Sequence, residues 1–227
     1  MFRWLMIGCA VLGVAFSLGI AGMIVSPSLR EPVIREILGW GDVDRPVDPS
    51  VVRCMGGPDT SVNLRISGCT KLIESGHVSW VAFYNRGKAY SEIGDYDRAI
   101  QDYSQAIQLA PDDAEAFNGR CFARAVADKA LETALSDCNE SLRIKPNDAD
   151  TLDSRGFVYF RMSQYDKAIA DYDTALNKNP RLAESLYVRG IAKHRKGDPT
   201  GGDADIAAAL TQDPRIRAQY ARFGVTP

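Results

Sequence analysis

The stretch FYNRGKAYSEIGDYDRAIQDYSQAIQLAP, residues 83–111, decides the fold of this chain. Its pattern returns at residues 152–180 as LDSRGFVYFRMSQYDKAIADYDTALNKNP, with Arg-Gly, Tyr, Ala-Ile and Asp-Tyr at the same offsets. Prolines close four successive units at intervals of 35, 34 and 34 residues, at Pro111, Pro146, Pro180 and Pro214. A nearly constant period in this range is typical of stacked supersecondary units.

Each unit reads as a helical hairpin, because small residues recur where two helices must approach closely. Gly87 stands in the first helix of its unit opposite Ala99 in the second. Glycine inside a helix costs about 1 kcal/mol relative to alanine, so close packing is its natural compensation. Gly94-Asp95 then breaks the chain between the two helices. A single hairpin buries only one face, so such an array needs several stacked units.

The two best copies resemble the tetratricopeptide repeat, and the copies at 114–148 and 183–216 are looser versions of it. The resemblance covers roughly two thirds of the chain. It implies an all-α fold, a right-handed α-solenoid of about four helical hairpins. The expected parts are a degenerate half repeat, four repeats and a C-terminal cap, at residues 59–79, 80–113, 114–148, 149–182, 183–216 and 217–227.

The N-terminal residues 1–25 predict export from the cytoplasm. Between Arg3 and residue 26 no side chain is charged, and the run is about long enough to cross a bilayer as a helix. It is either an uncleaved signal anchor or a signal peptide that is removed. Residues 26–58 follow as a tether rich in proline and glycine. The globular part is then expected in the cell envelope, anchored in the inner membrane and facing the periplasm, or free in the periplasm if the signal is cleaved.

The composition argues against nucleic-acid binding and offers no catalytic motif. The formal net charge is -2 and the pI is about 5.8, whereas nucleic-acid-binding domains usually carry a basic surplus. His77 and His194 lie far apart with no ligand spacing around them, and no nucleophile, phosphate-loop or zinc-protease motif occurs. We therefore expect no enzyme activity, no cofactor and no metal, and a protein or peptide as partner.

Two charged positions recur in all four units, an arginine in the first helix and an aspartate in the second. Two interpretations are open: an electropositive stripe for an acidic partner, or a structural ladder of ion pairs. A matched acid for every arginine favours the ladder, because partly buried charges need partners. The residues are Arg86, Arg120, Arg155, Arg189, Asp102, Asp137, Asp171 and Asp205.

Four cysteines remain once Cys9 of the N-terminal run is set apart. In the repeat register Cys121 and Cys138 fall on facing helices at similar heights, and disulfides persist in oxidising compartments. A bridge between them is expected, with Cys54 bridging Cys69 and fixing the tether to the first helix. Buried free thiols that fill gaps in the core are the alternative.

In proteins that share this repeat, the first helices line a groove that holds a partner peptide or helix. Carried over position by position, the resemblance implies a partner-binding set in this chain. It comprises Tyr84, Asn85, Lys88, Asn118, Phe122, Asp153, Phe157, Phe160, Arg161, Tyr187, Ile191, His194 and Arg195. Phe122, Phe157, Phe160 and Tyr187 exceed what packing needs, so we expect them to be exposed as anchors for a partner. The alternative is that the cap or a curled neighbour covers them.

These observations favour a non-catalytic scaffold or adaptor of the cell envelope that binds a partner in its groove. Two rivals remain. A self-associating structural module would fill the groove with a second copy of the chain. The other is an accessory subunit of an exported enzyme, or a weak hydrolase whose active site no motif reveals.

Overall fold

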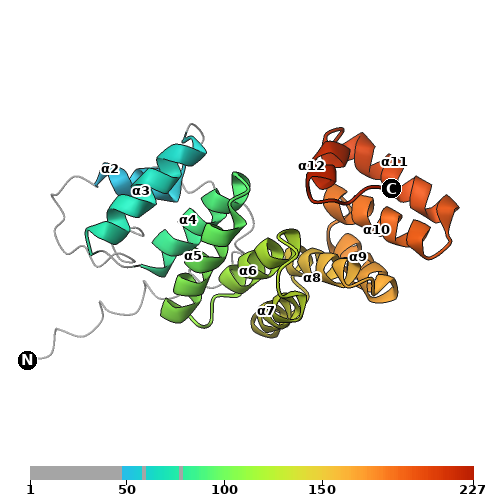
Figure 1. Ribbon diagram of the computed structural model, residues 1–227, viewed down its shortest axis with the longest axis horizontal. Coiled ribbons are helices and arrows are strands. Elements are labelled where there is room, and N and C mark those ends of the chain that lie inside the picture. Colours follow the sequence, from blue (N-terminus) through green and yellow to red (C-terminus); the bar gives the residue numbers. More distant parts are fainter. Residues whose placement is uncertain (1–47, 58–59, 77–78) are drawn as a thin grey trace, which may run out of the picture. The chain divides into compact units, whose positions relative to one another are not determined.

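The computed structural model describes residues 48–57, 60–76 and 79–227, and within these ranges all the regular structure is helical (Figure 1). The helices are α2 (Pro49–Met55), α3 (Val62–Glu74), α4 (Trp80–Glu92), α5 (Tyr96–Leu109), α6 (Ala114–Val126), α7 (Leu131–Ile144), α8 (Ala149–Arg161), α9 (Tyr165–Lys178), α10 (Ala183–Arg195), α11 (Pro199–Gln212) and α12 (Ile216–Arg222). The predicted N-terminal segment 1–25, and the tether as far as residue 47, lie outside the described residues. In the described part of the chain, no helix has the length and apolar character that a membrane span requires.

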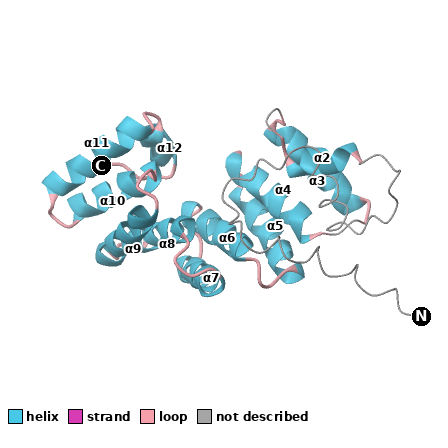
Figure 2. Cartoon of the chain, turned by 180° about the vertical axis from the view of Figure 1, so that it is seen from behind, coloured by secondary structure: helices cyan, strands magenta, loops and turns pink. Residues whose placement is uncertain are grey.

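Helices α4 to α11 form four hairpins, α4–α5, α6–α7, α8–α9 and α10–α11, which contact one another in chain order (Figures 1 and 2). Aspartates begin several of these helices. The Asp113 carboxylate accepts the backbone N–H of Ala116 at 2.8 Å, and the Asp148 carboxylate accepts that of Thr151 at 3.1 Å. Such caps satisfy N–H groups that a helix start otherwise leaves unpaired. The repeat boundaries therefore coincide with local stop and start signals in the sequence.

Small residues set the spacing inside each hairpin. A Cβ added to Gly87 would lie 3.2 Å from the Tyr103 ring, and one added to Gly190 would lie 2.7 Å from the carbonyl oxygen of Gly202. Side chains at these positions would push the paired helices apart. Gly94 ends α4 with a φ of +81°, a left-handed conformation that glycine adopts without the strain of a Cβ.

The structure contains the ladder of ion pairs, and each pair is bidentate. In the third hairpin, Arg155 Nε lies 2.7 Å from Asp171 Oδ2 and Arg155 Nη2 lies 2.8 Å from Asp171 Oδ1. The other three rungs have the same geometry, Arg86 with Asp102, Arg120 with Asp137 and Arg189 with Asp205. Because each guanidinium is engaged by its own carboxylate, the arginines do not form an unpaired positive stripe.

Each ladder arginine also donates a hydrogen bond to the second helix of the preceding helix pair, a contact that the repeat pattern did not predict. Arg155 Nη1 donates to Asn139 Oδ1 on α7 at 3.0 Å, and Arg189 Nη1 lies 2.7 Å from Asp173 Oδ1 on α9. Arg86 reaches Thr70 and Arg120 reaches Ser104 in the same way. These acceptors recur at one position of the second helix but differ in residue type. The ladder therefore ties neighbouring repeats together as well as the two helices of one hairpin.

Replacing Arg155 with alanine should lower the free energy of unfolding by about 1 to 3 kcal/mol, because Asp171 then loses its partner in a poorly solvated position. Urea unfolding followed by circular dichroism measures the change. Arg181→Ala is the matched control, since this exposed arginine lies outside the ladder. Equal stability of the two variants would contradict a structural role for the rung.

Two disulfides each join a pair of helices. Cys121 and Cys138, both 0 % exposed, connect α6 to α7. Cys54 and Cys69 connect α2 to α3. Here the structure differs from the expected tether, because residues 49–55 are helical. Asp48 caps this helix and Pro49 occupies its first turn, a combination that favours a helix start.

Candidate functional site

We call the surface lined by the first helices α4, α6, α8 and α10 the groove. Helix α12 covers its C-terminal half. The ring of Tyr220 lies 5.8 Å from that of Phe157 on α8 and 5.6 Å from that of Tyr187 on α10, between centroids. Phe157 is 1 % exposed and Tyr187 is 0 % exposed, so the expectation that they stand exposed is wrong. An apolar stripe shows which face of a helix is buried, but it does not show which element buries it.

The turn after α12 extends this cover toward the second repeat. Phe223 makes edge-to-face contacts with Phe122 on α6 and Tyr96 on α5, each with 6.4 Å between ring centroids. Arg161 on α8 donates from Nη1 to the Phe223 carbonyl oxygen at 3.0 Å. Its Nη2 lies 2.8 Å from a carboxylate oxygen of Asp128 in the α6–α7 loop. Arg161, expected to contact a partner, thus fixes the C-terminal turn.

Other predicted groove residues also serve internal packing. Ile191 is 0 % exposed, and the ring of Phe160 stacks on that of Phe157 at 6.3 Å. His194 Nε2 lies 3.0 Å from a carboxylate oxygen of Asp203 on α11, and Arg195 is exposed on the last turn of α10. In the described ranges no cluster of three or more His, Cys, Asp or Glu side chains could hold a metal ion.

The N-terminal half of the groove is open. A cleft of about 1020 Å³ lies between helices α4 to α6 on one side and α12 with its flanking turns on the other. Lys88 and Phe122 of the predicted set line it, together with Ile93, Val126 and Arg222. Ile93 is 50 % exposed, which is high for a large apolar side chain. Thus an apolar surface with charged edges stays accessible beside the part that α12 covers.

A smaller cavity of about 260 Å³ adjoins this cleft, and Tyr84, Lys88 and Asn118 line it. The Tyr84 hydroxyl donates to Glu115 at 3.2 Å, and burial raises the pKa of this phenol well above its usual value, with Glu115 adding to the shift. Asn118 Oδ1 is buried and accepts no hydrogen bond from the part of the chain that the structure describes. The predicted residues on α4 and α6 therefore do converge on open space. Asn85, in contrast, donates to the sulfur of Met55 on α2.

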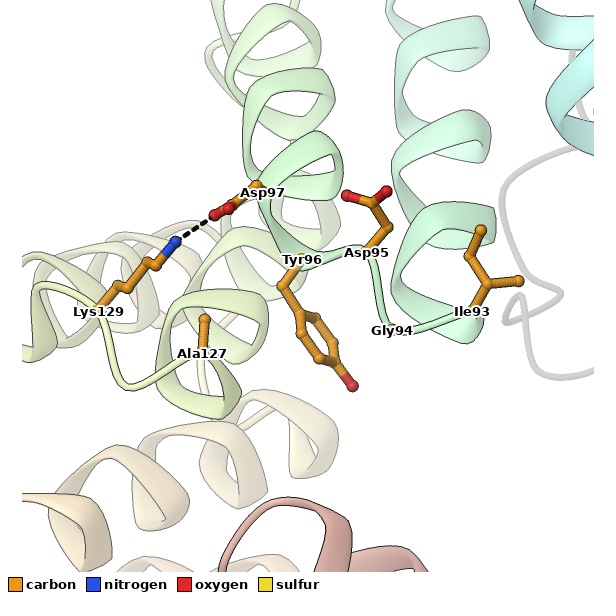
Figure 3. A pocket seen from close by; sticks show the side chains of 7 residues that line it. All are labelled: Ile93, Gly94, Asp95, Tyr96, Asp97, Ala127 and Lys129. Atoms are coloured by element: carbon orange, nitrogen blue, oxygen red, sulfur yellow. Dashed lines mark hydrogen bonds and ion pairs between the residues drawn. The ribbon is translucent and has the colours of Figure 1, made fainter.

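A third hollow of about 470 Å³ lies at the α4–α5 turn (Figure 3). An ion pair between Lys129 Nζ and Asp97 Oδ1, at 2.5 Å, borders it. Figure 3 shows the Tyr96 ring pointing away from this pair. Tyr96, Ile93 and Gly94 also line the larger cleft, so the two hollows share one edge.

Gly119, which the repeat pattern did not mark as functional, opens the groove to an aromatic ring from a second helix. A Cβ added to Gly119 would lie only 2.6 Å from Cζ of Tyr103. The ring of Tyr103, from α5, therefore passes close to α6 and lines both cavities. Burial raises the pKa of Tyr103 to about 12. The only signal in the sequence is a glycine in a predicted helix interior with no counterpart in the repeat pattern.

Asp153 lies in the covered half of the groove without a cationic partner among the described residues. Its carboxylate accepts a hydrogen bond from the Ser185 hydroxyl on α10. Burial raises the pKa of Asp153 to about 7, and Glu184 and Asp150 add to the shift. Burial likewise raises the pKa of Tyr220 well above its usual value, and the charge of Asp153 contributes. A carboxyl group that ionises near neutral pH therefore lies near the docking site of α12.

Two family models match the sequence, one described as tetratricopeptide repeat over residues 80–113 and one as TPR repeat over residues 158–197. No curated protein matches. The matched segments cover the hairpin α4–α5 and a stretch from α8 into α10. Both therefore fall on the elements that line or support the groove.

Several solved structures resemble the chain. A crystal structure of MamA protein is 23% identical with a TM-score of 0.55; the matched region covers 70% of this chain and 86% of the MamA chain. TTC0263, a thermophilic TPR protein in Thermus thermophilus, is 20% identical with a TM-score of 0.60, covering 73% and 91%. MamA 41-end from Desulfovibrio magneticus RS-1 is 18% identical with a TM-score of 0.59, covering 81% and 94%. At these identities the likeness establishes the fold alone.

Proposed function

Because the chain is a tetratricopeptide-repeat protein, we propose that it is a non-catalytic scaffold that holds a segment of a partner protein in its groove. One observation carries the proposal: the groove already holds a helix of its own chain. Tyr220 of α12 is 1 % exposed and its ring contacts those of Phe157 on α8 and Tyr187 on α10; Ile216, four residues earlier on the same face, is 0 % exposed. A surface that accommodates one amphipathic helix in this way is suited to bind another.

The partner segment is expected in the N-terminal half of the groove. Here the cleft of about 1020 Å³ and the cavity of about 260 Å³ adjoin at Lys88 and Tyr103. The C-terminal half offers no comparable exposed aromatic surface, since α12 covers Phe157 and Tyr187. Binding to the open half leaves the intramolecular contacts of α12 in place.

A photoreactive amino acid introduced at position 88 of the full-length chain tests this proposal. We expect it to crosslink to a single partner segment, identified by mass spectrometry, and the same segment to be crosslinked from position 118. Position 101 is the matched control, because Gln101 is exposed on the second helix α5, outside the two cavities.

Equal crosslinking from positions 88 and 101 would contradict a groove-bound partner. Crosslinks from position 88 to a second copy of this chain would instead support the self-associating module.

We further propose that the protein works in the cell envelope. Two disulfides support this, since such bonds persist in oxidising compartments. The uncharged run that follows Arg3 in the sequence supports an anchor or a cleaved signal. Alkaline washing of isolated membranes tests the proposal: an anchored chain stays with the membranes, and a processed chain is released without its N-terminal segment. Recovery of the intact chain from the cytoplasm would contradict it.

A further inference from the structure

The open cleft carries an excess of positive charge once the side chains that already form ion pairs are set aside. Its acidic residues already have partners: Glu92 pairs with Arg65, and Asp213 pairs with Arg215. Two cations that line the cleft, Lys88 on α4 and Arg222 on α12, have no ion pair among the described residues, and both are exposed. They come from elements that form opposite sides of the cleft. The cleft therefore carries uncompensated positive charge on both sides.

Between these cations, apolar side chains line part of the cleft. Ile93 is exposed at the α4–α5 turn, and Phe122, Val126 and Phe223 line the cleft as partly buried or buried groups. An apolar side chain that binds against Ile93 removes apolar surface from water on both groups, which favours binding. The same surface gives no such gain to a ligand that is polar throughout.

The neighbouring cavity limits how a charged ligand can lie. Lys145 and Asp148 line that cavity as an ion pair at 2.7 Å, and Glu115 and Asp150 line it without a cationic partner among the described residues. Lys88 lines both the cavity and the cleft. A carboxylate placed near Asp150 meets like charge, which is unfavourable. Carboxylates are therefore directed toward the Lys88 and Arg222 side, away from α8.

We propose that this cleft binds an acidic segment of a partner protein, in which carboxylate side chains flank an apolar residue. The carboxylates face Lys88 and Arg222, and the apolar side chain lies against Ile93 and Phe122. The inference rests on the proposed function and specifies the chemistry of the partner. It also gives α12 a second role, because Arg222 supplies one side of the site while Tyr220 fixes the helix in place.

Fluorescence anisotropy with a labelled synthetic peptide tests the proposal on the full-length protein. The probe is a short peptide with glutamates on both sides of one leucine, acetylated and amidated so that its ends carry no charge. We expect it to bind, and we expect the same peptide with glutamines to bind at least about tenfold more weakly. Binding should also weaken as salt rises.

The protein variants make the test specific. Lys88→Gln with Arg222→Gln should reduce affinity for the glutamate peptide by at least about tenfold and abolish its preference over the glutamine peptide. Arg181→Gln, which removes an exposed cation outside the cleft, should change neither. Thermal unfolding of each variant shows whether it remains folded.

Equal binding of the two peptides, or no binding of either, would overturn the acidic-segment proposal. So would tighter binding of a single-stranded oligonucleotide of equal charge. If crosslinking from position 88 still captured a partner segment, the groove function would stand and only the partner chemistry would be wrong.

Discussion

Replacing Tyr220 with alanine should destabilise the docking of α12 by about 3 to 5 kcal/mol, the usual range for removing a large buried aromatic side chain. Tyr220 is 1 % exposed and contacts three rings, with centroid distances of 5.8 Å to Phe157, 5.6 Å to Tyr187 and 5.4 Å to Phe223. Its removal leaves a cavity between α8, α10 and α12. Because α12 is only seven residues long, it is not expected to stay helical when undocked.

Hydrogen exchange measured by mass spectrometry follows this change. Amides of residues 216–222 should lose most of their protection in the Tyr220→Ala chain, and those of α4 and α5 should keep theirs. Gln219→Ala, on the exposed side of the same helix, is the matched control and should leave protection unchanged. Unaltered exchange in the Tyr220 variant would show that this ring does not hold α12 in the groove.

Raising the pH from 5 to 8 should lower the stability of the folded chain, by about 3 kcal/mol from Asp153 alone. The pKa of this carboxyl is raised to about 7 by burial from an ordinary value of 3.8. Because folding raises this pKa, the contribution of the Asp153 carboxyl to stability is fully present below pH 3.8. It is lost as the pH rises through about 7. The groups that face it or act on it are Asp150, Tyr172, Glu184, Ser185 and Tyr220.

Asp153→Asn separates this contribution from the remaining pH dependence. The asparagine keeps an acceptor for the Ser185 hydroxyl but carries no charge. We expect the variant to be more stable than the parent chain at pH 8 and the difference to shrink toward pH 5, as measured by urea unfolding. Asp112→Asn, an exposed residue in the α5–α6 turn, is the control. An unchanged stability difference between pH 5 and pH 8 would contradict the account.

Much of the scaffold could be predicted from local patterns. The proline interval gives the period of the array, and the glycines opposite small residues indicate which helices pack closely. The Arg155–Asp171 rung follows from spacing, because the repeat places both residues at one height of a hairpin. Such features depend on contacts inside one repeat or between equivalent positions, so a sequence of this regularity reveals them.

The cover over the groove could not be predicted in the same way. Periodicity identified Phe157 and Tyr187 as surplus aromatics and favoured their exposure, with cover by the cap as the alternative. Their partner is Tyr220, at least 33 residues away in sequence. Contacts between the terminal helix and earlier repeats depend on how the array curls, which no local signal encodes. Of the predicted partner-binding residues, Lys88 and Phe122 line the open cleft, whereas Phe157 and Tyr187 are buried where α12 lies.

Helix α2 was missed for another reason. Its seven residues lie among prolines and glycines that predict an irregular segment. A helix this short is not stable alone and depends on tertiary contacts, here with α3 through the Cys54–Cys69 disulfide. The buried faces of Val51 and Cys54 are visible only once α3 is in place.

The most direct test of the account is a nuclear Overhauser measurement on the ring protons of Tyr220 in isotopically labelled protein. If α12 covers the C-terminal half of the groove, we expect cross-peaks from the Tyr220 ring to the rings of both Phe157 and Tyr187. Cross-peaks from Tyr220 only to residues within α12, with Phe157 and Tyr187 free to contact solvent, would contradict it.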